Sequence, residues 1–200
     1  TSFQNKEFFL KNLPKEVHQG AAILCKKRLE EKEPFLYEVM KRKKKKLFLV
    51  LDHVTDPHNV GACLRNASAA GVDAVIVPKN RACHLTAAAR KVSCGGSELI
   101  PFVVVVNLVR TINFLKQSGV KVLGADKSSK ASYDDISLSG DVAFVIGSEE
   151  RGLKLLTAKN CENLISIPMP GEIESLNLSV SSGILLFEYL RQNKKSKEEN

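Results

Sequence analysis

LFLVLDHVTDPHNVGACLRNASAAGVDAVIV, residues 47–77, contains two kinds of hydrophobic pattern. It begins with the continuous apolar run LFLVL and ends with another, DAVIV. Between these runs, apolar residues recur at i, i+3, i+4 and i+7, the spacing of one helix face: Val60, Cys63, Leu64 and Ala67. The stretch therefore predicts a strand, a helix that ends at Gly71, and a second strand.

The same alternation continues toward the C-terminus. Four more short runs are rich in β-branched residues: 100–106, 121–126, 141–147 and 163–168. One helix is predicted after the N-cap Asn107, with an apolar face made by Leu108, Ile112 and Leu115. The last helix is predicted to bury Val180, Ile184 and Phe187. Strands that alternate with helices indicate an α/β fold with an open parallel sheet covered on both faces.

Residues 1–46 have weak periodicity and many charges. VHQGAAILCKK (17–27) is a candidate strand, and 31–46 is predicted to be a basic linker with one short helix. We therefore divide the chain into an N-terminal remnant (1–30), this linker, the α/β domain (47–192) and a charged tail (193–200). Because the sequence begins at Thr1, we expect a fragment or a processed product.

The composition is that of a globular protein. With 200 residues, 44% hydrophobic and 26% charged, the chain can form one domain with a substantial core. No apolar run approaches the roughly 20 residues that span a bilayer, and TSFQNKEFFL does not have the pattern of a secretory signal. The five cysteines include no C-x-x-C pair, which favours reduced thiols in a cytoplasmic protein over disulfides or a metal site.

The net charge of +8 is concentrated in one short run. KRKKKK (41–46) contributes +6, whereas residues 47–190 hold thirteen basic and fourteen acidic groups. Two interpretations of this run stay open: contacts with nucleic-acid phosphates, or a solvated spacer.

Two motifs follow predicted strands, at the carboxyl ends where ligands bind in parallel sheets. In DPHNVGACLR (56–65), Asn59 is a suitable N-cap and Arg65 points away from the apolar stripe of its helix. FVIGSEERGL (144–153) places Gly147 in a turn and Glu149 near a helix start. An exposed arginine or a glutamate at a helix start is ordinarily only a surface residue.

A third motif, ISIPMPGEIESLNLSVSSGILLFEYLR (165–191), ends a strand in a polar turn and opens the last helix. Ser175 and Asn177 would ordinarily be capping residues. The small residues after them suit close helix packing: Ser179, Ser181, Ser182 and Gly183. Taken singly, each of the three motifs is a weak signal.

Together, the motifs resemble the SpoU/TrmH family of RNA 2′-O-ribose methyltransferases in the SPOUT superfamily. N-x-G-x-x-x-R occurs at 59–65, G-x-E-x-x-G at 147–152, and P-x-x-G…S-L-N-x-S at 168–179. Residues 47–191 look most like bacterial enzymes that methylate a guanosine ribose in large-subunit ribosomal RNA. HQG (18–20) resembles the end of their N-terminal RNA-binding domain. Glu150 and Arg151 stand where many members have at least one glycine.

The resemblance implies a C-terminal trefoil knot, which general topology rules make rare. It implies S-adenosylmethionine bound in the knot, in contact with Gly147, Ile167 and Leu176, and a homodimer with sites completed across its interface. The ribose 2′-hydroxyl would attack the sulfonium methyl group. Arg65 would stabilise the charge that develops on the oxygen, since arginine is not deprotonated in proteins.

The other catalytic assignments are also implied by the resemblance. Asn59 would orient the ribose or the arginine, Glu149 would accept hydrogen bonds from the arginine or its neighbours, and Ser175 and Asn177 would shape the cofactor-side wall. RNA is the expected partner, with no membrane and no metal. Two alternatives stay open: a transfer-RNA 2′-O-methyltransferase, or an inactive RNA-binding or ribosome-assembly module. The presence of Asn59, Arg65 and Asn177 favours an enzyme.

Overall fold

A computed structural model of the chain describes residues 2–14, 18–22 and 26–194. Within this part, seven strands form one sheet in the order β1-β4-β3-β2-β6-β5-β7, and every pairing is parallel. The strands are β1 Glu31–Lys32, β2 Leu47–Asp52, β3 Ala74–Pro78, β4 Phe102–Val105, β5 Lys121–Ala125, β6 Val142–Gly147 and β7 Asn163–Ile165. The helices are α1 Lys6–Asn12, α2 Pro34–Met40, α3 Pro57–Ala70, α4 Ala87–Val92, α5 Gly96–Leu99, α6 Leu108–Gln117, α7 Leu155–Asn160 and α8 Leu178–Asn193.

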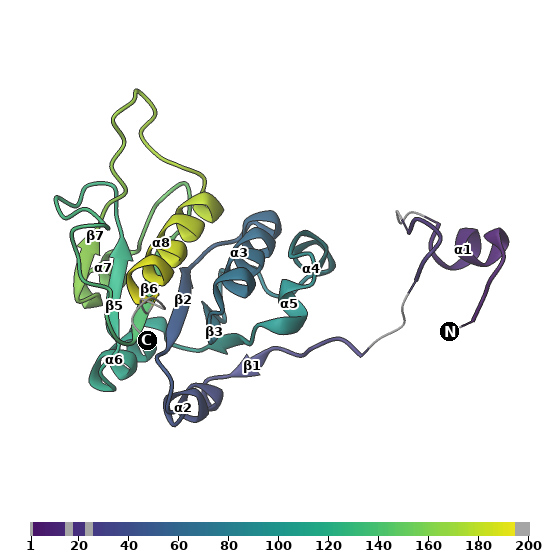
Figure 1. Cartoon of the computed structure of the whole chain (residues 1–200), viewed down its shortest axis with the longest axis horizontal. Coiled ribbons are helices and arrows are strands. Elements are labelled where there is room, and N and C mark those ends of the chain that lie inside the picture. Colours follow the sequence, from purple (N-terminus) through teal and green to yellow (C-terminus); the bar gives the residue numbers. More distant parts are fainter. Residues whose placement is uncertain (1, 15–17, 23–25, 195–200) are drawn as a thin grey trace, which may run out of the picture.

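Helices cover both faces of the sheet (Figure 1). On one face, α3 and α8 pack against the larger apolar cluster, with α4 and α5 beside α3. On the other face, α2 and α6 pack against a second cluster, with α7 beside α6. Every residue of β2, β3 and β6 is buried, as expected for strands covered on both sides. All six predicted strands and the open parallel sheet are therefore confirmed.

The start of α3 differs from the prediction. The N-cap is Asp56, whose side chain accepts hydrogen bonds from the backbone N–H groups of His58 and Asn59, and Pro57 occupies the first helical position. Asn59 therefore lies within the first turn, so its side chain is not needed for capping. The predicted end is confirmed, because Gly71 adopts φ +71° as the C-cap.

The predicted apolar faces of two helices are confirmed and that of α8 is wrong. The stripe of α3 and that of α6 are buried. In α8, however, Val180 and Phe187 have exposed fractions of 49% and 51%. The apolar residues that α8 buries are instead Leu178, Leu185, Leu186 and Tyr189. The helix has two apolar stripes with similar spacing. The predicted stripe is half exposed, and the second stripe faces the sheet.

Small residues let α8 approach α3 closely. The side-chain amide of Asn66 donates to the backbone oxygen of Ser179 at 2.7 Å and to Oγ of Ser182 at 3.1 Å. Cys63 lies 3.5 Å from the same hydroxyl, and its burial raises the pKa of its thiol to about 12. This thiol stays protonated at neutral pH and serves packing.

The segment 31–46, expected to be a linker, is docked onto the domain. Glu31–Lys32 pairs with β4, and the short helix predicted there is α2, which buries Leu36 and Val39. Edge pairing and apolar burial therefore make it part of the packed domain. In the remnant 1–30, α1 has no buried residue. The candidate strand 17–27 lies partly outside the described residues, and its described positions form no strand.

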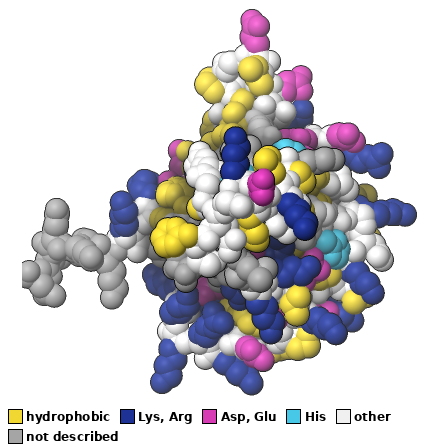
Figure 2. Space-filling view, turned by 90° about the vertical axis from the view of Figure 1, so that its right-hand side faces the viewer, with side chains coloured by type: hydrophobic (Ala, Val, Ile, Leu, Met, Phe, Trp, Pro, Cys, Tyr) yellow, Lys and Arg dark blue, Asp and Glu magenta, His cyan; other side chains and the backbone are white. Residues whose placement is uncertain are grey.

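The basic run 41–46 lies at the amino-terminal end of β2. Lys44 and Arg42 form ion pairs with the buried carboxylate of Asp73, at 2.7 and 3.6 Å, and Lys46 pairs with Asp141 at 3.1 Å. Lys and Arg side chains gather toward the bottom of the face in Figure 2, the end of the molecule where α2 lies in Figure 1. Part of the run is thus engaged in anchoring the sheet, while its contact with RNA stays a prediction.

Asp73→Ala should lower the free energy of unfolding by about 1–3 kcal/mol, because Oδ2 of Asp73 accepts the backbone N–H of Leu47 at 3.1 Å and that donor would be left unsatisfied. Urea denaturation measures the change. Asp135→Ala, at an exposed position, is the control and should be nearly neutral. Equal effects of the two substitutions would contradict the anchoring role of Asp73.

Candidate functional site

The topology places a switch point between β2 and β6. From β2 the chain continues to β3 and β4 on one side, whereas β5 and β7 lie on the other side of β6. Asp52, the last residue of β2, is in register with Gly147, the last residue of β6. Ligands of open α/β sheets bind beyond the carboxyl ends of the strands at such a point, and two cavities lie there.

The loop after β6 requires glycine at two positions. A Cβ on Gly147 would lie 2.0 Å from the carbonyl carbon of Gly152, so no side chain fits. Gly152 itself adopts φ +63°, and its N–H donates to the oxygen of Ser148 at 2.8 Å. Glu150 and Arg151, the departures from the family pattern, are both exposed at the tip of this turn. They leave the close crossing of the backbone intact.

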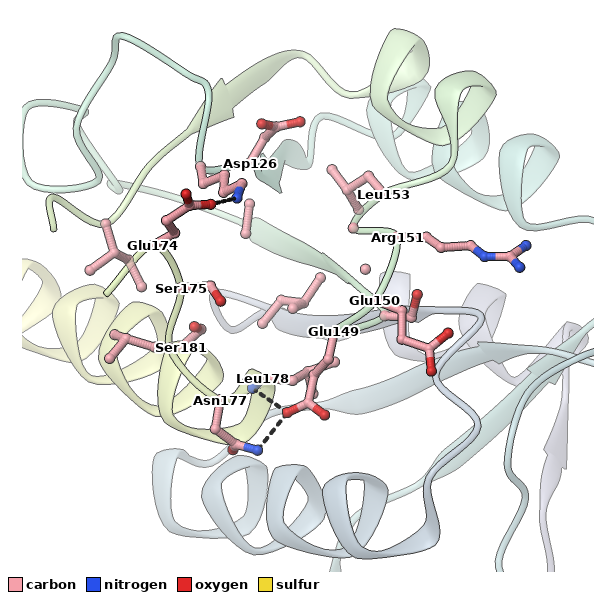
Figure 3. A pocket seen from close by; sticks show the side chains of 18 of the residues that line it. Asp126, Glu149, Glu150, Arg151, Leu153, Glu174, Ser175, Asn177, Leu178 and Ser181 are labelled. Carbon is pink, nitrogen blue, oxygen red and sulfur yellow. Dashed lines mark hydrogen bonds and ion pairs between the residues drawn. The ribbon is translucent and has the colours of Figure 1, made fainter. Parts of the chain in front are cut away.

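Three predicted site residues from different motifs meet in one hydrogen-bond network. The side-chain amide of Asn177 donates to Oδ1 of Asn59 at 2.9 Å and to Oε1 of Glu149 at 2.6 Å. Figure 3 shows Glu149 directed from the 147–152 loop toward Asn177 at the start of α8. Leu178 N–H also donates to this carboxylate oxygen, at 3.3 Å. The network joins β6, α3 and α8 at one point.

Asn177 also caps α8, as predicted. Its Oδ1 accepts the backbone N–H groups of Ser179 and Val180, at 2.9 and 3.4 Å, and the hydroxyl of Ser179 at 2.5 Å. The capping bonds fix the carbonyl end of this side chain, and the amide end is thereby aimed at Asn59 and Glu149. One residue therefore serves both the helix terminus and the site.

The first cavity lies on the α8 side of Glu149 and has a volume of about 480 Å³. It is lined by Ser175 and by all the cofactor residues that the resemblance implies, namely Gly147, Ile167 and Leu176. Its polar lining includes Asp126 at the end of β5 and Ser181 of α8 (Figure 3). Neither was predicted to be a site residue; the position of Asp126 at the end of the predicted strand 121–126 is the signal that could have identified it.

An ion pair joins two of the loops around this cavity. Nζ of Lys127 lies 2.8 Å from Oε2 of Glu174 (Figure 3). The hydrogen bond and the charge of Lys127 lower the pKa of Glu174. Both side chains are well exposed, so the pair orders loops rather than adding much stability.

The lining of the first cavity suits a nucleoside cofactor. Its volume is within the range of small-molecule sites, and its lining combines apolar side chains, which suit a base, with polar groups, which suit a ribose. The bare backbone at Gly147 permits close approach by a ligand. No group of His, Cys, Asp and Glu suited to holding a metal ion is found among the described residues.

The second cavity, also about 480 Å³, lies on the α3 side of the same loop. Residues 148–153, Glu149 among them, line both cavities. The second cavity adds Asn59 from α3, Asp52 and His53 from the end of β2, and Arg81 from the loop after β3. Asp52, His53 and Arg81 were not predicted to be site residues, although each ends or follows a predicted strand.

Arg65 lies outside both cavities. It is exposed on α3, as predicted from the helical spacing, and its Nη1 is 3.6 Å from Sγ of Cys94. The structure thus brings together Asn59, Glu149 and Asn177 and places Ser175 nearby, but within one chain it does not bring Arg65 to them.

Comparison with known proteins identifies close relatives. Residues 46–187 match the model of the SpoU rRNA Methylase family. The chain is 45% identical to the 23S rRNA (guanosine-2′-O-)-methyltransferase RlmB of Haemophilus influenzae, covering 95% of this chain and 78% of that protein. It is 42% identical to the enzyme of the same name from Escherichia coli, with 94% and 77% covered. The AdoMet-bound rRNA methyltransferase from Sinorhizobium meliloti is 25% identical, with a TM-score of 0.70 over 82% of this chain and 71% of that one.

Gly147→Ala should weaken binding of S-adenosylhomocysteine at least about 10-fold, which is about 1.4 kcal/mol, because the added methyl group would displace the backbone of Gly152. Isothermal titration calorimetry measures the affinity. Gly171→Ala is the matched control, since a Cβ there meets nothing within 4 Å, and it should bind normally. Unchanged affinity in Gly147→Ala would contradict the placement of the cofactor in the first cavity.

Proposed function

The chain belongs to the SpoU rRNA methylase family, and we propose that its two cavities hold S-adenosylmethionine and a guanosine of 23S ribosomal RNA for methylation of the ribose 2′-hydroxyl. The observation that carries this proposal is the wall that the cavities share. Glu149 lines both cavities, Asn177 lines the first and Asn59 the second. Because hydrogen bonds join the three side chains, ligands in the two cavities would approach one connected polar network.

S-adenosylmethionine supplies a methyl group made electrophilic by its sulfonium. The transfer would form a bond from the ribose oxygen to the methyl carbon and break the bond from that carbon to sulfur. The thioether S-adenosylhomocysteine would leave, and the hydroxyl proton would pass to solvent. The contribution of the protein is to align the reacting atoms and to stabilise charge on the oxygen. The amide of Asn59, buried and fixed by Asn177, is suited to orienting the ribose. Glu149 holds Asn177 in place, and Ser175 and Leu176 close the cofactor side.

The direct test is methylation of purified RNA. With S-adenosylmethionine labelled in its methyl group, the chain should label 23S ribosomal RNA at a guanosine 2′-oxygen, and nuclease mapping locates the label. Labelling of transfer RNA alone would replace this substrate with the alternative. Cofactor and RNA binding without any transfer would support an inactive binding module.

We further propose that the chain acts as a homodimer. Val180, Ile184 and Phe187 form an apolar stripe on α8 that is half exposed in one chain, and it is well placed for burial against a second copy. A dimer also offers a role for Arg65, which lies outside both cavities of its own chain: it would enter the site of the partner. The C-terminal trefoil knot and a cytoplasmic location are likewise proposed from the family resemblance.

Arg65→Ala should slow methyl transfer at least about 100-fold, because an arginine that stabilises a developing oxyanion typically contributes roughly 3–4 kcal/mol to the barrier. Folding and S-adenosylhomocysteine affinity should be unchanged, since Arg65 is an exposed residue. Arg65→Lys should restore little, because an ammonium group lacks the planar donor fork of arginine. Near-normal single-turnover rates in the alanine variant would show that Arg65 is only a surface residue.

Light scattering of the purified chain should report twice the mass of 22.0 kDa, and Phe187→Asp should shift it toward the monomer. If Arg65 acts in the partner's site, mixing inactive Arg65→Ala and Asn177→Ala chains should restore about a quarter of wild-type activity through heterodimers with one intact site. A monomer that methylates RNA at full rate would contradict the dimer. A dimer without such restoration would contradict only the shared site.

A further inference from the structure

The second cavity has features of a binding site for an anionic polymer. Three exposed cationic residues line it: Arg81, Arg151 and Lys154. Four carboxylates also line it, but three are engaged within the protein. Asp56 accepts the backbone N–H groups of His58 and Asn59, and Glu149 accepts from Asn177.

The third engaged carboxylate, Asp52, is almost completely buried. Its Oδ2 accepts the backbone N–H of Lys154 at 2.8 Å, and its Oδ1 contacts Nδ1 of His53. Both carboxylate oxygens are therefore bonded within the protein rather than exposed to a ligand. The same bonds tie the end of β2 to the loop that carries Arg151 and Lys154, so that the cavity walls are fixed to one another.

Backbone conformation singles out Arg81 in this cavity. Four described residues other than glycine adopt positive φ, and two of them, His53 at +59° and Arg81 at +55°, line the second cavity. The left-handed region is costly for a side-chain-bearing residue and tends to occur at functional sites. Arg81 thus carries a long cationic side chain at a backbone position that glycine would adopt without strain.

The loop that carries Arg81 is also held rigidly. Cys83 N–H donates to the carbonyl of Val54 at 2.8 Å, which joins the loop to the segment after β2. The ring of His84 lies 3.0 Å from both the carbonyl of Lys79 and Oε2 of Glu30. Burial lowers the pKa of His84, but these bonds outweigh it and raise the value. Glu30, from the N-terminal segment, thus helps to hold Arg81.

We propose that Arg81 binds an RNA phosphate in the second cavity and thereby positions the target nucleotide. The inference rests on the proposed function. Because the cavity includes Asn59 and Glu149, a phosphate held by Arg81 would fix the ribose next to the wall that both cavities share. The planar guanidinium suits bidentate contact with phosphate oxygens.

Arg81→Ala and Arg81→Gly test this role. Both should raise KM for 23S ribosomal RNA about 10- to 100-fold, the effect of one lost charge-assisted contact. The kcat and the affinity for S-adenosylhomocysteine should be nearly unchanged. The slope of log binding constant against log salt should fall by about one for the lost phosphate contact. Because glycine adopts positive φ freely, the glycine variant excludes backbone strain as the cause.

The control is Lys130→Ala, which removes an exposed charge outside both cavities. It should leave KM and the salt slope near wild type, and Arg81→Lys should recover part of the loss. Normal KM and an unchanged slope in both Arg81 variants would overturn the proposal. Failure of the wild-type chain to methylate any RNA would instead overturn the proposed function, and the salt slope still reports on Arg81 in that case.

Discussion

The hydrogen bonds of one side chain, that of Asn177, connect the end of the fold to the centre of the site. Its oxygen caps α8, the last helix, and its amide nitrogen bonds to Asn59 on α3 and Glu149 after β6. A capping bond typically contributes about 1 kcal/mol. Here the same bonds also determine the direction of the amide. Helix position and site geometry therefore cannot vary independently.

This coupling depends on the parallel sheet. Register between β2 and β6 places Asp52 beside Gly147 at the carboxyl edge. The loop after β6 lines both cavities, and the loop after β2 lines the second. The amino-terminal edge has a different role, because the lysines and arginine before β2 pair there with Asp73 and Asp141. The ion pairs that anchor the sheet and the cationic residues that line the second cavity thus lie at opposite edges of the sheet.

Much of the fold could be predicted because its signals are local. Apolar runs identified the strands, and Asn107, Asn177 and Gly71 marked helix ends by their capping chemistry. The features that could not be predicted depend on tertiary packing or on a choice between similar residues. The two apolar stripes of α8 are equivalent in spacing, and only packing shows that Leu185 and Leu186 face inward. The N-cap of α3 was predicted to be Asn59. Asp56, three residues earlier, offers the same capping chemistry, and it is the N-cap in the structure.

The site residues were likewise predicted where a local motif marks them and missed where only the tertiary structure does. The motifs identified Asn59, Glu149 and Asn177, and the structure shows them in contact. His53 and Arg81 were missed, since neither belongs to a motif and their positive φ cannot be recognised from residue type. Arg65 was correctly placed on the exposed face of its helix, but its distance from both cavities is a consequence of tertiary structure.

In the proposed arrangement, the cofactor lies in the first cavity and the RNA ribose in the second, with Asn59, Glu149 and Asn177 between them. A crystal structure of the chain with S-adenosylhomocysteine tests this arrangement most directly. We predict adenosine density between Gly147, Ile167 and Leu176, with the sulfur turned toward Glu149 and the second cavity open. Density for the ligand in the second cavity, or a sulfur turned away from Glu149, would contradict the account.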